Sequence, residues 1–384
     1  MNILNLSLDR SLVSNTRIGD SMERFIAYSQ YCHKYIVIVP TTIKPAYLTK
    51  KYGSKIIVYA ACGPNKYAAY YQIFRLSASI SRQEKIDLIT TNDFVTAVIA
   101  KLSTVGLATK VQLNVFGLPL VQRRWLFSKP IHLLMSLFQI LAIYWSDSIR
   151  TDTTRDGQHL ITYFRVNPSK IITLPVPPSP NIQKQLVSKS RQTKLRTQLT
   201  SGKDYLVLSV GTLNINKDFD NLIKATAIIV NQGVKIKVLI VGNGPQKEHL
   251  QKIIDQFSLA DTITFYGSAT YQQLIRLYHA ADILVSSSLL EGLPRVLMEA
   301  ALSGLPIVAT NTSGTADLIV DHQSGLVVPI EDSQQLAAAI NILIFNPQLA
   351  DKFAVKAQQH ALKYLNFNSN LKQLAHNWQQ LSNQ

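Results

Sequence analysis

The chain has 384 residues, of which 47% are hydrophobic and 16% are charged, and its formal net charge is +16. This composition excludes a wholly disordered chain, and the length suits two domains of ordinary size. Residues 1–175 hold 21 Lys and Arg against 9 Asp and Glu, whereas residues 176–384 hold 18 against 14, so the basic excess lies in the first half. A basic domain attracts anionic lipids, nucleic acid or phosphorylated substrates, although the charge could also serve only solubility.

The cysteines and the N-terminus indicate the cellular compartment. Cys32 and Cys62 show no metal-ligand spacing and no disulfide framework, which favours a reducing cytosol. The first ten residues lack a basic start before a long apolar run, so we expect a buried strand there and no signal peptide. No basic and aromatic recognition module indicates nucleic acid as a partner.

Short apolar runs alternate with stretches of helical length along the whole chain. Many runs are rich in Val and Ile without polar alternation, which is typical of parallel strands covered on both faces. The pattern predicts two doubly wound α/β domains. The expected strands cover residues 35–39, 55–59, 88–90, 110–113 and 148–151 in the first half, and 205–210, 235–241, 262–266, 283–286 and 306–309 in the second.

The longest apolar tract covers residues 131–145. It is short for a transmembrane helix and contains polar residues, so we favour a buried helix of the first domain. The alternative is an interfacial helix against an anionic membrane, because Arg123, Arg124 and Lys129 precede the tract.

A proline-rich segment separates the two halves. Residues 174–180 hold four prolines, which stop both helices and central strands. We therefore predict a first domain over 1–175, a hinge and linker over 176–204, and a second domain over 205–365. We expect residues 366–384 to form a C-terminal helix that packs back on the first domain, with Leu371, Leu374, Trp378 and Leu381 on one face.

The strongest functional pattern follows the expected strand at 283–286. Glu291 lies in the loop after this strand, and Glu299 lies two turns into the helix that follows. Ligands of open α/β sheets bind beyond the carboxyl ends of strands, where helix N-termini favour phosphate. Carboxylates accept hydrogen bonds from vicinal hydroxyls, so the pair could hold a sugar and a ribose. The alternative is that both glutamates are ordinary capping or solvated residues.

The segment Glu291-Gly-Leu-Pro-Arg-Val-Leu-Met-Glu-Ala-Ala301 resembles the Glu-x7-Glu motif of the retaining family 4 glycosyltransferases, also called group 1. The resemblance implies the GT-B fold, in which two Rossmann-like doubly wound domains face each other across a cleft and a C-terminal helix crosses back to the first domain. Further segments similar to this family lie at 210–225, 239–245, 263–267, 278–282, 310–319 and 324–329.

The resemblance implies a retaining hexosyltransferase that uses a UDP- or GDP-sugar and needs no metal or other cofactor. Glu291 would contact hydroxyls of the transferred sugar, Lys217 would neutralise the diphosphate, and Glu299 would bind the ribose. Thr212 stands where the family usually has an Arg, which Arg295 could replace. The other donor-binding residues implied by the resemblance are Gly211, Gly292, Leu293, Pro294 and Val296.

The acceptor is expected on the basic first domain. The resemblance implies a glycan or lipid-linked glycan acceptor in bacterial-type surface polysaccharide or glycoconjugate assembly, in the cytoplasm and peripheral to the inner face of the membrane. Phe116 stands where many members have a His. Two alternatives are a non-catalytic transferase-like subunit and a nucleotide-sugar epimerase on the same fold. The candidate acceptor-side residues are Arg17, Gly19, Asp20, Asn92, Asp93 and Phe116.

Overall fold

The computed structural model divides into two compact units. The first unit comprises Met1–Ser179 and Phe367–Gln384, and the second comprises Pro180–Asn366. The chain thus passes from the first unit to the second inside the proline-rich segment. The structure describes residues 1–13, 20–118, 120, 130–188 and 192–383.

The described strands of the first unit form an eight-stranded sheet in the order β3-β4-β2-β1-β5-β6-β7-β8. The pairings are parallel, except that β3 pairs antiparallel with β4. Strands β2, β3 and β4 lie on one side of β1, and β5 to β8 lie on the other. The strand order therefore reverses between β1 and β5. The strands are β1 (Asn2–Leu6), β2 (Lys34–Thr41), β3 (Thr49–Tyr52), β4 (Ile56–Cys62), β5 (Leu88–Thr91), β6 (Lys110–Val115), β7 (Ser148–Thr151) and β8 (Ile171–Thr173).

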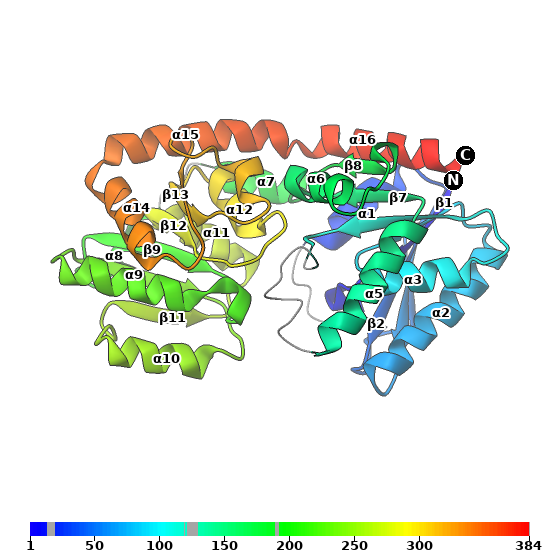
Figure 1. Cartoon of the computed structure of the whole chain (residues 1–384), viewed down its shortest axis with the longest axis horizontal. Coiled ribbons are helices and arrows are strands. Elements are labelled where there is room, and N and C mark those ends of the chain that lie inside the picture. The colour runs from blue at the N-terminus through cyan, green and yellow to red at the C-terminus, as the bar shows by residue number, and fades with distance from the viewer. Residues whose placement is uncertain (14–19, 119, 121–129, 189–191, 384) are drawn as a thin grey trace. The chain divides into compact units, whose positions relative to one another are not determined.

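Helices cover this sheet, and three of them form one layer. Helix α2 packs on α3, and α3 packs on α5 (Figure 1). The described helices of the unit are α1 (Ser21–Ser29), α2 (Lys66–Gln83), α3 (Phe94–Ser103), α5 (Pro130–Trp145), α6 (Thr154–Thr162) and α16 (Phe367–Ser382), with 3-10 turns η1 (Arg10–Val13) and η3 (Pro168–Lys170).

The described strands of the second unit form a six-stranded, all-parallel sheet in the order β11-β10-β9-β12-β13-β14. Its strand order reverses between β9 and β12. The strands are β9 (Tyr205–Val210), β10 (Ile236–Val241), β11 (Ile263–Gly267), β12 (Ile283–Ser286), β13 (Ile307–Thr310) and β14 (Leu326–Val328). The helices are α7 (Pro180–Val187), α8 (Thr193–Thr200), α9 (Phe219–Asn231), α10 (Lys247–Gln256), α11 (Tyr271–Ala280), α12 (Arg295–Leu302), α13 (Thr315–Leu318), α14 (Ser333–Phe345) and α15 (Pro347–Tyr364), with the 3-10 turn η4 (Ile215–Lys217).

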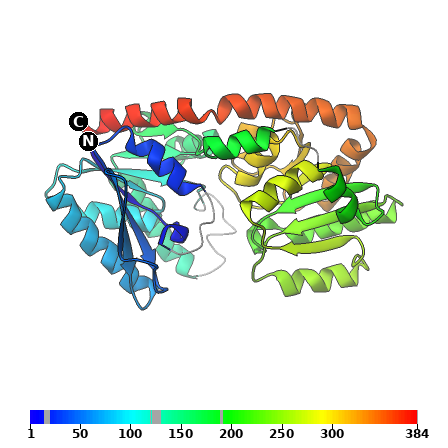
Figure 2. The same cartoon turned by 180° about the vertical axis from the view of Figure 1, so that it is seen from behind.

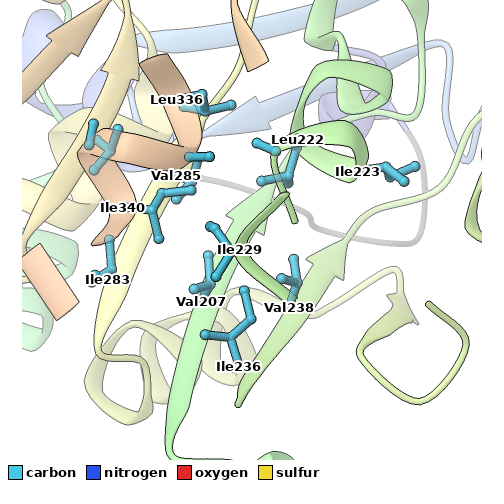
Figure 3. Close-up of a cluster of buried hydrophobic side chains, with 14 of the residues drawn as sticks. Val207, Leu222, Ile223, Ile229, Ile236, Val238, Ile283, Val285, Leu336 and Ile340 are labelled. Carbon is cyan, nitrogen blue, oxygen red and sulfur yellow. The ribbon is translucent and has the colours of Figure 1, made fainter. Parts of the chain in front are cut away.

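Apolar side chains of the second sheet pack on helices at both faces. Figure 3 shows one cluster, in which Val207 and Val238 of the strands meet side chains of α9 and α14, among them Ile229 and Ile340. A second cluster joins the sheet to α11 and α12. Because these strands are covered on both faces, their sequences are continuous apolar runs. The runs expected to be strands in both halves all form strands.

The C-terminal helix α16 belongs to the first unit. Its residue Trp378 packs edge-on against Tyr28 at 5.6 Å between ring centroids. The Trp378 Nε1 also donates a hydrogen bond to Gln112 Oε1 of β6 at 2.9 Å. The end of α16 therefore lies beside the start of β1, as both views show (Figures 1 and 2).

Two expectations differ from the structure. The linker expected over 176–204 is mostly helical from residue 180, because Ile182 and Leu186 of α7 bury their side chains in the second unit. The helix expected at 131–145 forms as α5, but much of its apolar surface is exposed instead of buried. The apolar content of the segment predicts a helix, but it does not show which side of that helix is covered by the rest of the protein.

Candidate functional site

The loops after β9 and β12 lie at the carboxyl ends of two adjacent strands, where the strand order of the second sheet reverses. In open α/β sheets, ligands usually bind beyond the carboxyl ends of the strands at such a reversal. The loop after β9 leads through η4 to Lys217, and the loop after β12 carries Glu291. The backbone N–H of Leu289 donates to the Asn216 carbonyl at 2.8 Å, which fastens one loop to the other.

Lys217 and Glu291 form an ion pair between these two loops. The Lys217 Nζ donates to Glu291 Oε1, and the Ser288 hydroxyl donates to the same oxygen at 3.0 Å. Ser287 donates to the Lys217 carbonyl at 2.8 Å and fixes the backbone of the lysine. Both charged side chains keep some exposure, so the structure places a cation and a carboxylate together at an accessible point.

Gly211 provides the space through which the Lys217 side chain reaches this point. A Cβ atom added at Gly211 would lie 2.8 Å from Lys217 Cε and 3.0 Å from Cδ. Gly314 plays a comparable part for the other loop, because a Cβ there would lie 2.3 Å from the Gly292 carbonyl oxygen. Small residues therefore let the segments that carry the ion pair approach closely.

Glu299 lies within α12 and is only 2% exposed. Tyr271 donates to Glu299 Oε1 at 2.6 Å, and Tyr278 donates to Oε2 at 2.8 Å. Burial and the neighbouring Glu299 charge raise the pKa of both phenols, so they remain protonated donors. The structure thus gives both carboxylate oxygens protein partners, and a ribose would have to share them or displace one.

Arg295 is the partner of Glu299 closest to solvent. Its Nε lies 3.1 Å from Glu299 Oε1, and its guanidinium lies 5.9 Å from the centre of the Tyr271 ring. Arg295 begins α12, where helix amides and the dipole favour an anion. Thr212 is exposed in the loop after β9. The remaining members of the donor set expected from sequence, Gly292, Leu293, Pro294 and Val296, form the loop and the first turn of α12.

The first unit has a pocket of about 210 Å³ at the point where its own strand order reverses. Asn5 of β1, Thr90 of β5 and Asn114 of β6 come from three adjacent strands and line it. One buried oxygen of each of these side chains has no hydrogen-bond partner among the described residues. Three unsatisfied acceptors around one pocket suit a ligand with several hydroxyl donors.

Aromatic rings and a buried cation complete this pocket. Phe25, Phe116 and Trp378 contribute apolar surface to its lining. Arg150 is buried there and donates to the carbonyl oxygens of Leu174 and Pro175. Burial lowers the pKa of this arginine. Rings together with a few hydrogen-bonding groups are the usual components of a small-molecule site.

The candidate acceptor-side residues fall into three groups: two line the pocket, two make structural contacts, and two lie outside the described residues. Asn92 and Phe116 line the pocket. Asp93 caps α3 by accepting from the Val95 and Thr96 amides, and burial raises its pKa. Asp20 is also structural, because its buried carboxylate pairs with Arg24 and accepts the Ser179 N–H at 2.6 Å. Asp93 and Asp20 therefore have structural partners, and their role toward a ligand stays a prediction. Arg17 and Gly19 lie outside the described residues.

Several residues of both sites escaped the sequence analysis. Tyr271 and Tyr278 lie 28 and 21 residues before Glu299, and only the packing of α11 on α12 makes them its partners. The sequence pattern could have identified Asn5 and Thr90 as candidates, because each is a polar residue within a buried strand. A polar side chain near the carboxyl end of such a strand needs a partner, and this marks it as a candidate.

Comparison with known proteins agrees with this architecture. Residues 190–360 match the family model "Glycosyl transferases group 1". The amylovoran biosynthesis glycosyltransferase AmsD of Erwinia amylovora is 32% identical over 163 residues, which are 42% of this chain and 45% of AmsD. The chain spans less than half the length of this relative and of the first curated relatives it matches.

Solved structures match the whole chain. A sucrose-phosphate synthase from Thermosynechococcus elongatus has a TM-score of 0.84 at 16% identity and covers 99% of both chains. Anabaena HepE in complex with UDP-glucose has a TM-score of 0.74 at 18% identity, with 99% of this chain and 100% of that one covered. The chain therefore has the GT-B fold of two parallel-sheet, Rossmann-like α/β units, and the match to the glycosyl transferases group 1 model lies in its second unit.

Proposed function

We propose that the protein transfers a sugar from a nucleotide-sugar donor to a hydroxyl of a glycan acceptor. The observation that carries this proposal is the ion pair of Lys217 with Glu291, held by two loops where the strand order of the second sheet reverses. A cation suits the diphosphate of the donor, and a carboxylate suits the hydroxyls of the sugar. The region matched by the group 1 family model includes both residues.

The proposed chemistry depends on charge that develops during bond cleavage. As the bond between the sugar and the diphosphate breaks, negative charge grows on the leaving phosphate oxygens. A lysine fixed by Gly211 and Ser287 stabilises that charge more than the ground state, and so accelerates the step. When the donor binds, the Lys217 ammonium would leave its partner Glu291 and bind the diphosphate. The Glu291 carboxylate would then be free to accept hydrogen bonds from hydroxyls of the sugar.

The donor is proposed to be a UDP- or GDP-sugar that reacts with retention of configuration and without a metal. The HepE complex with UDP-glucose, a protein of the same fold, supports the uridine nucleotide. Glu299 would accept hydrogen bonds from ribose hydroxyls at Oε1 once Arg295 and Tyr271 turn away from that oxygen. Retention follows from the resemblance of the Glu291–Glu299 segment to the retaining family.

The acceptor is proposed to bind the pocket of the first unit through the oxygens of Asn5, Thr90 and Asn114. A glycan or lipid-linked glycan fits this set, because its hydroxyls supply the missing donors. The name of the relative AmsD supports a place in bacterial polysaccharide assembly. We place the protein in the cytoplasm and peripheral to a membrane.

The test measures nucleotide release from a panel of nucleotide sugars, with and without glycan acceptors. We expect Lys217→Met and Glu291→Gln to lower turnover at least 100-fold, which is the loss typical of one transition-state contact. Lys247→Met and Glu248→Gln are matched controls at exposed positions of helix α10 and should keep full activity.

The alternatives give different outcomes in the same assay. Wild-type rates in both site variants would contradict the proposal. An epimerase would change the sugar while it stays attached to the nucleotide, without an acceptor product. A non-catalytic subunit would bind a nucleotide sugar, visible as a higher melting temperature, without turnover.

A further inference from the structure

Helix α5 has an inverted distribution of side chains. Its polar residues Ser136 and Gln139 are buried against the protein, whereas most of its apolar residues point outward. The helix carries no Asp, Glu, Lys or Arg. A helix on a water-exposed surface ordinarily shows the opposite arrangement. The exposed side chains are Ile131, Leu133, Leu134, Met135, Leu137, Ile140, Tyr144 and Trp145.

The neighbouring helices of the same layer also expose apolar side chains. Helix α2 exposes Tyr67, Tyr71 and Phe74, which recur at helical spacing along one side. At the end of α3, Leu102 and Val105 are also exposed. Because α3 packs between α2 and α5, these groups belong to one layer, which we call the α2–α3–α5 face (Figure 1). Such a large apolar face indicates an interaction site.

The charged residues within the three helices of this face are all basic. Helices α2, α3 and α5 contain Lys66, Arg75, Arg82 and Lys101 and not one acidic residue. Lys101 forms an ion pair with Asp147, which follows α5, so the exposed Lys66, Arg75 and Arg82 of α2 supply the positive charge of the described face. The sequence from 94 to 146 also has no Asp or Glu, and its Arg123, Arg124 and Lys129 lie outside the described residues. A partner for this face must therefore be apolar in its interior and negative at its surface.

We propose that the α2–α3–α5 face docks on a bilayer that contains anionic lipid. The apolar side chains of α5 enter the boundary between headgroups and acyl chains, the tyrosines of α2 lie at headgroup level, and the basic residues bind lipid phosphates. Helix α5 has 16 residues and lies on the surface of the bilayer. Among the described residues, no helix is long and apolar enough to cross a membrane. This inference does not depend on the donor chemistry.

The test is sedimentation of the full chain with vesicles. We expect binding to vesicles with 30% phosphatidylglycerol in phosphatidylcholine, at least tenfold weaker binding to phosphatidylcholine alone, and weakening by salt. Leu134→Glu with Leu137→Glu should weaken binding at least tenfold. The matched control is Val355→Glu with Leu362→Glu, which changes exposed apolar residues of α15 in the second unit and should bind like wild type.

Each outcome decides the inference. Absence of binding to the anionic vesicles overturns it, and so does wild-type binding by the α5 double variant. If that variant does not fold, Leu134→Ser with Leu137→Ser replaces it and should also bind at least threefold more weakly. A concentration-dependent dimer that the α5 variant abolishes, without vesicle binding, would assign the face to a second copy instead. Donor turnover without vesicle binding would refute this inference and the peripheral-membrane placement but leave the proposed sugar transfer intact. Vesicle binding without turnover would refute only the proposed sugar transfer.

Discussion

The buried carboxylate of Glu299 allows a quantitative prediction through Glu299→Gln. The substitution keeps the shape of the side chain but removes the charge that accepts from Tyr271, Tyr278 and Arg295. It also places an amide N–H₂ where one of the phenols now donates. We expect the variant to fold with a lower free energy of unfolding.

The magnitude follows from these contacts. Hydrogen bonds to charged groups contribute about 1.5–3 kcal/mol each, against about 0.5–1.5 kcal/mol for neutral pairs. Three weakened contacts would cost about 3 kcal/mol, and relief from burying the charge offsets part of this, so we expect a net loss of about 2 kcal/mol. For a unit of this size, that lowers the melting temperature by about 4–8 °C.

Calorimetry or urea unfolding of the full chain measures this loss. The exposed Glu248→Gln serves as control and should change stability by less than about 0.5 kcal/mol. Tyr278→Phe should lose less in the Glu299→Gln background than alone, because the two side chains share one hydrogen bond. A Glu299→Gln variant as stable as wild type, or strictly additive losses, would refute the buried network.

Two further predictions concern the loop after β9. Gly211→Ala should lower turnover roughly 10–100-fold with little change in unfolding free energy, because its Cβ would displace the flexible Lys217 side chain; unchanged turnover would show that Lys217 has room to adapt. Burial, followed by the charges of Asp220 and Glu331, raises the pKa of Asp218 from 3.8 to about 6. The folded state therefore holds this proton more tightly, and stability falls as the pH rises from about 4 to 6 and then levels off. Relative to Asp218→Asn, wild type should lose stability across that window in urea unfolding, and parallel curves would contradict the shift.

Much of the fold could be predicted because parallel strands leave a strong pattern. The continuous apolar runs, such as the one that became β10, belong to strands covered on both faces. The strand β3 left no such signal, because Thr49–Tyr52 is a polar, exposed strand at the edge of the sheet. Helix α8 was not predicted for a similar reason, since its sequence is mostly polar and only a few of its side chains, Leu195 and Leu199 among them, pack against the core of the second unit.

The site was predictable where one contiguous segment carries it. Glu291, Gly292 and Arg295 lie in one loop and one helix turn, so spacing alone brings them together. The pairing of Lys217 with Glu291 joins residues 74 apart in the chain and depends on the adjacency of β9 and β12. The pocket of Asn5, Thr90 and Asn114 depends likewise on three strands that are adjacent only in the folded sheet. Sequence patterns describe local order, whereas these contacts arise from strand order.

The place of α16 has a consequence for biosynthesis. The core of the first unit contains Phe367, Leu371 and Trp378, which are synthesised after all of the second unit, Pro180–Asn366. The first unit therefore lacks part of its interior until residues 367–384 have been synthesised. During that interval the ring of Tyr28 and the side chain of Gln112 lack their partner in Trp378. A chain truncated before residue 367 would therefore leave the core of the first unit open.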